Sequence, residues 1–265
     1  MAIGIGLLGL GTVGAGVAAI LASPEGRHPL VADVALRRVA VRDPARPRPL
    51  QLPEELIVTD PAAVVDDPAV EIVVEVMGGL EPARSLILRA IAAGKPVVTA
   101  NKAVIARHGE EIAAAAAARG VYVLIEAAVG GGIPIIEPLK QSLGSNRIRR
   151  VSGIINGTTN YILSRMAEEG AAYADVLADA QRLGYADQLG FVVKLLAVAE
   201  RQGEELPAAG DDGDAALPLD VRVHPTLLPR THPLAGVHGV NNAILVEGDP
   251  VGQVMFYGPG AGAGP

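Results

Sequence analysis

The stretch Gly9-Leu10-Gly11-Thr12-Val13-Gly14 lies between two apolar runs, Ala2–Leu8 before it and Ala15–Leu21 after it. This order predicts a strand, a tight turn and a helix. In a G-x-G-x-x-G turn the first glycine permits the turn, the second lets the backbone approach a pyrophosphate, and the third allows the helix to pack against the strand. The helix N-terminus offers unpaired N–H groups to the phosphates. The sequence therefore predicts a dinucleotide-binding turn.

Short apolar runs alternate with helix-compatible segments from residue 2 to about residue 125. Such alternation is typical of βαβ units and a parallel sheet. After about residue 127 the pattern changes to a glycine run followed by longer strand candidates. We therefore expect an α/β domain over residues 1–127, a second domain over 128–245, and a final segment, 246–265, that returns to the first domain.

Composition and charge exclude several classes of protein. Half of the residues are hydrophobic and the net charge is −7, so the chain is neither disordered nor suited to nucleic-acid phosphates. The sequence has no cysteine, which excludes disulfides and thiolate sites and fits a reducing cytoplasm. Residues 1–23 carry no charge, but they lack a basic n-region and hold several glycines, so we expect neither a signal peptide nor a membrane span.

The type of dinucleotide stays open at this point. An acidic residue at the end of the second strand binds the ribose of NAD, whereas an arginine there accommodates the 2′-phosphate of NADP. The second predicted strand ends in Val41-Arg42-Asp43, which provides both. The residues alone are compatible with NADP or with NAD.

Three further groups of residues suggest chemistry. Lys102 follows a short predicted strand, in the position where ligands bind at the carboxyl ends of parallel strands. Glu126 precedes a glycine run whose carbonyl oxygens are suited to a hard cation. A compact polar cluster, Asn156-Gly157-Thr158-Thr159-Asn160, joins two apolar elements and also reads as a helix N-cap.

Several strings of the sequence closely resemble homoserine dehydrogenases. They extend over nearly the whole chain in the order of that family: GLLGLGTVGAGV, VVEVMGGLEPAR, VVTANKAVIA, EAAVGGGIPII, NRIRRVSGIINGTTNYIL, QRLGYA, LGFVVKLLAVAER, VRVHPTLLPRTHPLAGVHGVNNAILVEGD and MFYGPGAGAGP. The resemblance implies a Rossmann-type parallel sheet domain with a second, α+β, substrate and dimerisation domain. It also implies interconversion of L-homoserine and L-aspartate 4-semialdehyde with NAD or NADP, for threonine, methionine and isoleucine biosynthesis, by a cytoplasmic homodimer.

The resemblance also assigns roles to single residues. It places the cofactor beside Thr12, Val13, Lys102, Gly184 and Gly262, in addition to Gly9, Gly11, Gly14 and Arg42, which the motif itself suggests. Lys102 corresponds to an active-site lysine of the family. A monovalent cation, Na⁺ or K⁺, is implied at Glu126, Val129, Gly131 and Ile133.

The chain departs from the family after Ala186. The family continues there with substrate-binding carboxylates and a lysine that transfers a proton, whereas this chain reads Asp187-Gln188-Leu189-Gly190 and then Phe191-Val192-Val193-Lys194. In one alignment Lys194 is that catalytic lysine. In the alignment we favour, Lys194 lies in a later strand, a few tens of residues are absent, and Asp187 replaces the missing glutamate. The alternative function is therefore a catalytically impaired nucleotide-binding remnant of the family.

Overall fold

A computed structural model describes residues 2–48, 50–155, 191–202 and 218–260. The chain divides into two compact units, the first ending at Val129 and the second running from Gly130 to Gly264. This division lies two residues beyond the expected end of the first domain. Each unit is described by itself below.

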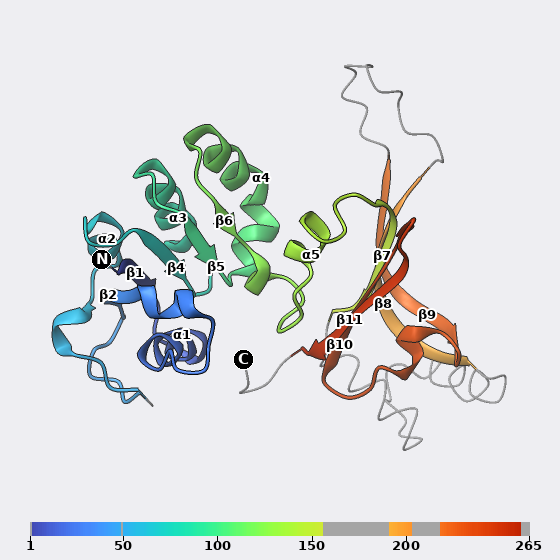
Figure 1. The fold of residues 1–265 in the computed structure, drawn as a ribbon, viewed down its shortest axis with the longest axis horizontal. Helices are drawn as coiled ribbons and strands as arrows, with labels where there is room; N and C mark the ends of the chain where they lie inside the picture. The colour runs from blue at the N-terminus through green and yellow to red at the C-terminus, as the bar shows by residue number, and fades with distance from the viewer. Residues whose placement is uncertain (1, 49, 156–190, 203–217, 261–265) are drawn as a thin grey trace. The chain divides into compact units, whose positions relative to one another are not determined.

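The first unit is built on a parallel sheet of six strands (Figure 1). The strands follow one another in the sheet as β3-β2-β1-β4-β5-β6, which is the order of a dinucleotide-binding Rossmann domain. All five neighbouring pairs are parallel. The bounds are β1 Ile3–Leu8, β2 Val34–Ala40, β3 Ile57–Val58, β4 Ile72–Glu75, β5 Val97–Thr99 and β6 Val123–Leu124.

Helices cover both faces of this sheet. Helix α1 (Thr12–Ala22) packs on one face, where Ala18 meets Ile5 and Leu7 of β1 in a buried cluster. On the other face, α2 (Pro61–Asp66), α3 (Ala83–Ala92) and α4 (Lys102–Arg119) form a second cluster with Leu8. Adjacent residues of β1 thus contribute to opposite cores, as the alternation of side chains along a strand requires.

Local sequence signals explain the ends of these helices. The side chains of Asp60 and Asn101 accept hydrogen bonds from backbone N–H groups in the first turns of α2 and α4. Gly120 ends α4 in the left-handed conformation, with φ +70°, which favours glycine. The strands and helices expected before residue 126 are therefore confirmed, with shifts of a few residues at their ends.

The second unit contains an antiparallel sheet of five strands in the order β11-β10-β7-β8-β9 (Figure 1). A short helix, α5 (Ile136–Lys140), precedes it. Leu234 of a 3₁₀ turn, η4 (Pro233–Gly236), is buried in one cluster with residues of β7, β8 and β10. The bounds are β7 Arg147–Ile154, β8 Phe191–Arg201, β9 Leu219–Pro229, β10 Asn241–Asp249 and β11 Gly252–Pro259.

We expected residues 246–265 to return to the first domain. In the described part of this segment, residues 246–249 lie in β10 and residues 252–259 form β11, a strand that we did not predict, which pairs with β10 from Asn241 opposite Pro259 to Gly248 opposite Gly252. Residues 261–265 lie outside the described residues. The backbone hydrogen bonds of this hairpin hold residues 246–259 in the second sheet. The expected helices within residues 161–183 lie outside the described residues.

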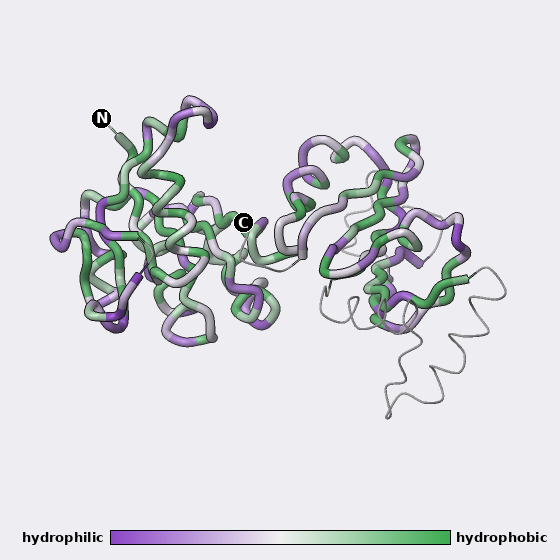
Figure 2. Tube along the Cα trace, turned by 90° about the horizontal axis from the view of Figure 1, so that it is seen from below, coloured by the Kyte–Doolittle hydropathy of each residue, from purple (hydrophilic) through white to green (hydrophobic). Residues whose placement is uncertain are grey.

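Hydrophobic and hydrophilic residues are interspersed along the tube of Figure 2. No helix within the described ranges is long and apolar enough to cross a membrane. The uncharged N-terminal stretch forms β1 and α1 instead, as its glycines predicted.

Candidate functional site

The glycine turn has the geometry that its three glycines predict. Gly9 adopts φ +104°, and a Cβ atom there would lie 3.1 Å from the carbonyl oxygen of Val76. A Cβ atom on Gly14 would lie 2.1 Å from the carbonyl oxygen of Gly9, so only glycine allows α1 to pack this closely. A Cβ atom on Gly11 would meet nothing within 4 Å. The second glycine thus faces open space, which is what a nearby ligand requires.

The start of α1 is free to bind an anion. Gly11 is its N-cap and no side chain caps it, while Thr12 and Val13 are exposed in its first turn. Backbone N–H groups in the first turn of a helix have no partner within the helix, and the helix dipole is positive there.

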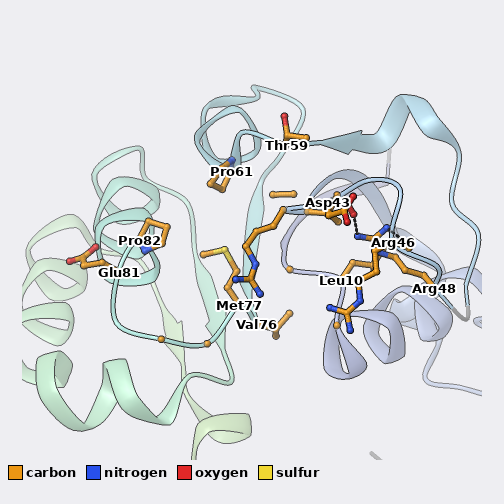
Figure 3. A pocket seen from close by; sticks show the side chains of 17 residues that line it. Leu10, Asp43, Arg46, Arg48, Thr59, Pro61, Val76, Met77, Glu81 and Pro82 are labelled. Atoms are coloured by element: carbon orange, nitrogen blue, oxygen red, sulfur yellow. Dashed lines mark hydrogen bonds between the residues drawn. The ribbon is translucent and has the colours of Figure 1, made fainter.

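A pocket of about 870 Å³ opens beside this turn (Figure 3). In the figure, Asp43, Arg46 and Arg48 lie on one side of the pocket, Glu81 and Pro82 lie on the opposite side, and Thr59 and Pro61 lie above. Its volume suits a ligand larger than a single amino acid. The lining residues are Gly9, Leu10, Gly11, Ala40, Val41, Arg42, Asp43, Arg46, Arg48, Thr59, Pro61, Val76, Met77, Gly78, Gly79, Glu81 and Pro82.

The basic side of the pocket is formed by the loop that comes directly after β2 in the sequence. The carboxylate of Asp43 accepts a hydrogen bond of 2.9 Å from the backbone N–H of Ala45, so it is bound to its own loop. Arg48 donates to the carbonyl oxygens of Asp43, Pro44 and Arg46, and it thereby fastens the same loop. Its Nε atom is buried and has no hydrogen-bond partner within the described part of the chain.

Arg42 and Arg46 are exposed on this side of the pocket. Neither forms an ion pair or a side-chain hydrogen bond with another described residue. Arg42 was predicted from the sequence, whereas Arg46, Arg48 and Thr59 were missed. The Pro- and Arg-rich composition of residues 44–53 was a signal for them, but only the fold of the loop brings these side chains to the pocket.

The opposite side of the pocket carries negative charge. Glu81 accepts a hydrogen bond from the Ser85 hydroxyl at 2.7 Å. This bond, with others from the Ser85 N–H and Arg84, holds the pKa of Glu81 below its usual value. The pocket is therefore polarised, with arginines near β2 and a carboxylate before α3.

Lys102 is exposed and is the first residue of α4. The preceding residue, Asn101, is buried and caps the helix through a hydrogen bond of 3.2 Å from the Val104 N–H to its Oδ1. Lys102 thus stands at the carboxyl end of β5, where its position in the sequence predicted it.

The predicted cation ligands occur in one short stretch of the chain. Glu126 begins a 3₁₀ turn, η3 (Glu126–Ala128), and Val129 ends the first unit, while Gly131 and Ile133 belong to the second. Gly131 adopts φ +67° and Ile133 is buried. The cation site stays a prediction.

Lys194 lies in strand β8, where it is buried and donates to the carbonyl oxygen of Val237. Lys194 therefore lies in a strand, as in the alignment that we favour. Gly184, Asp187 and Gly262, together with the polar cluster 156–160, lie outside the described residues.

Models of protein families match both parts of the chain. Residues 9–126 match "Homoserine dehydrogenase, NAD binding domain", and residues 134–189 and 186–265 match "Homoserine dehydrogenase". The chain belongs to the homoserine dehydrogenase family. It is thus a member of a family of oxidoreductases.

Curated and solved members of the homoserine dehydrogenase family agree with this assignment. The homoserine dehydrogenase of Synechocystis sp. is 52% identical and that of Bacillus subtilis is 36% identical, each over 100% of this chain and 71% or 70% of the relative. The crystal structure of a homoserine dehydrogenase from Thiobacillus denitrificans has a TM-score of 0.80 at 39% identity and covers 99% of this chain and 70% of that chain.

The comparisons also locate the departure from the family. The match to "Homoserine dehydrogenase" comes in two pieces that meet at residues 186–189. The alignment with the Synechocystis relative spans 315 positions, 50 more than the 265 residues of this chain. Part of the family sequence is therefore absent within this chain, and the match to the family breaks where we expected it, after Ala186.

Proposed function

We propose that this chain binds NAD(P) in the pocket beside Gly9–Gly14 and catalyses the reaction of its family. In that reaction L-homoserine and NAD(P)⁺ give L-aspartate 4-semialdehyde, NAD(P)H and a proton. The observation that carries the proposal is the open space at Gly11, at the start of an uncapped helix, in a region that matches the family's NAD-binding domain. The comparisons do not favour the alternative of a remnant without activity.

The residues of the chain fit the parts of a dinucleotide. The N–H groups at the start of α1 would bind the pyrophosphate, and the loop after β2 would hold the adenosine ribose. The bound nicotinamide supplies the hydride acceptor. Lys102, a cation at the carboxyl edge of the sheet, would stabilise negative charge on the substrate oxygen. The test is the formation of reduced cofactor when L-homoserine and NADP⁺ are added to the protein.

We further propose that the cofactor is NADP rather than NAD. One oxygen of the Asp43 carboxylate, the group that would accept the hydrogen bond of the NAD ribose, already accepts from the Ala45 N–H, so at most its second oxygen is available to a ribose. Arg42 and Arg46, which have no partner among the described residues, present two guanidinium groups to the same side of the pocket. A guanidinium group binds a phosphate through charge-assisted hydrogen bonds, so these side chains favour a 2′-phosphate.

Substitution of these arginines tests the choice of cofactor. We expect Arg42→Ala and Arg46→Ala each to weaken NADPH binding by about 10- to 100-fold, because each removes charged hydrogen bonds to a phosphate. NADH binding should change little, and this difference is measured by fluorescence titration of both cofactors. Arg107→Ala is the matched control, since it removes an exposed arginine of α4 outside the pocket. Equal losses for NADPH and NADH would contradict the assignment.

We also propose a monovalent cation, Na⁺ or K⁺, bound by the Glu126 carboxylate and the carbonyl oxygens of Val129, Gly131 and Ile133. Within the described ranges, no donor forms a hydrogen bond to these three carbonyls, whereas the Gly130 carbonyl accepts from the Asn242 amide and the Ile133 N–H. Carbonyl oxygens that accept no hydrogen bond within those ranges would, together with a carboxylate, be suitable ligands for a hard cation.

Melting experiments test the cation. A ligand that binds only the folded state stabilises it, so adding K⁺ or Na⁺ at constant ionic strength should raise Tm relative to tetramethylammonium. Glu126→Gln should remove this difference, while Glu110→Gln, an exposed glutamate of α4, should leave it. A Tm that responds equally in the wild type and in Glu126→Gln would overturn the proposed ligand.

The biological setting follows the family and is likewise proposed. We infer a homodimeric cytoplasmic enzyme of threonine, methionine and isoleucine biosynthesis that acts on a small amino acid. A row of exposed apolar side chains on β9 supports dimerisation, because surfaces of this kind commonly contact other chains. The row contains Leu219 (59% exposed), Val221 (67%), Val223 (62%) and Leu227 (57%). The mass in sedimentation equilibrium decides the oligomeric state.

A further inference from the structure

Glu75, the last residue of β4, is a carboxylate with 0% exposure. Its Oε2 accepts a hydrogen bond of 2.7 Å from the Thr99 hydroxyl, and its Oε1 accepts one of 2.8 Å from the Met77 N–H. The side-chain amide of Asn101 lies 3.5 Å from the same Oε1. No described lysine or arginine forms an ion pair with Glu75. Such a buried acid is tolerated only where donors like these satisfy it.

Hydrogen bonds of Glu75 and Asn101 also hold the turn that follows β4 at both of its ends. Glu75 holds the Met77 N–H at the beginning of the turn, and the Asn101 amide donates to the Gly79 carbonyl at 2.8 Å at its end. Between these points, Gly78 and Gly79 both adopt φ +77°, which few side chains tolerate. Residues 76–79 form one wall of the cofactor pocket, so these bonds determine where that wall lies.

Thr99 and Asn101, which both contact Glu75, also hold the beginning of α4 in place. The Thr99 hydroxyl accepts a hydrogen bond of 3.0 Å from the Asn101 N–H, and the Asn101 Oδ1 in turn accepts one from the Val104 N–H. Lys102 lies between these two anchored residues. Glu75 is therefore linked to the backbone next to Lys102 by a network of hydrogen bonds through Thr99 and Asn101. It is linked to the pocket wall by its hydrogen bond from the Met77 N–H.

We propose that Glu75 is a positioning residue that holds the pocket wall, residues 76–79, and the active-site Lys102 as one rigid unit. The proposal rests on the proposed function, because it assumes that this pocket receives the cofactor. Glu75 itself is not among the residues that line the pocket, so we assign it no direct part in the reaction. Its role is to couple two segments that are separated by more than 20 residues and are joined here by side chains.

The decisive variant is Thr99→Val, which keeps the shape of the side chain and removes the hydroxyl between Glu75 and Asn101. Thr99 forms no hydrogen bond with Met77. If the pocket wall and Lys102 are held as one rigid unit, loss of the Thr99 hydroxyl should nevertheless affect the Met77 amide. We expect amide hydrogen exchange to accelerate by about tenfold at Val104 and also at Met77. The reason is that the loss of one buried hydrogen bond changes the equilibrium between the closed and the open segment by about tenfold. NADPH affinity should fall by a similar factor.

Two controls separate positioning from loss of stability. Thr99→Ser keeps the hydroxyl and should restore both exchange rates and NADPH affinity. Val97→Ala removes buried methyl groups of β5 without touching the network; it should lower Tm but keep the NADPH affinity. Acceleration at Val104 alone, with Met77 exchange and NADPH binding as in the wild type, would overturn the proposal. If the wild type binds neither NADPH nor NADH, the proposed function fails, while the exchange data still decide the coupling.

Discussion

Restoring the missing segment is expected to raise the rate of L-homoserine oxidation by about 10²–10⁴, the usual contribution of general acid–base catalysis. The segment is the sequence of about 50 residues that the Synechocystis relative has in excess of this chain, inserted at the junction of residues 186–189. By resemblance to the family, this segment carries the carboxylates that bind the substrate amine and the lysine that transfers the proton. Lys102 remains in the chain as it stands and would account for a residual activity before insertion. The measurement is kcat for NADP⁺ reduction in both chains.

Two further measurements make the insertion experiment decisive. NADPH affinity should be the same with and without the segment, because the pocket lies entirely within the first unit. An inserted Gly/Ser linker of equal length should give no gain in rate. If the original chain already turns over as fast as the restored one, the segment is dispensable. Asp187 and Lys194 would then be the next residues to substitute, although Lys194 is buried against the Val237 carbonyl.

Gly11→Val is expected to weaken binding of NADPH and NADH by at least about 100-fold, because its side chain would occupy the space where the pyrophosphate approaches the backbone. The folded structure should persist, since a Cβ atom at this position meets no other atom within 4 Å. Fluorescence titration measures the affinity, and Tm reports the stability. The result should be a chain that is folded but does not bind cofactor.

Two other glycines provide controls for this substitution. Gly16 also has open space around an added Cβ atom and lies outside the pocket lining, so Gly16→Val should keep cofactor binding. Gly14→Val should instead destabilise the fold, because its Cβ atom would lie 2.1 Å from the Gly9 carbonyl oxygen. Undiminished binding in Gly11→Val would show that the cofactor does not lie over this turn.

Most of the fold could be predicted from the sequence because its signals are local. The apolar run before Gly9, the caps Asp60 and Asn101, and the stop at Gly120 each act within a few residues. The hairpin strand β11 was missed because its stability comes from pairing with β10 rather than from its own sequence, Gly252–Pro259. Local patterns therefore recovered the parallel sheet well and the edge of the antiparallel sheet poorly.

The sequence by itself determined the glycine turn, the family and the position of the break after Ala186, since each depends on the order of residues along the chain. Only the tertiary structure decided how the charges of the pocket are partnered: Asp43, Arg42 and Arg46 all line it, but the Asp43 carboxylate accepts a hydrogen bond from its own loop, while the two arginines have no side-chain partner among the described residues. It also brought Glu75 to Thr99 and Asn101 through the pairing of β4 with β5. The physical reason is that a side chain's partners depend on loop conformation and strand pairing, which bring together residues far apart in the chain.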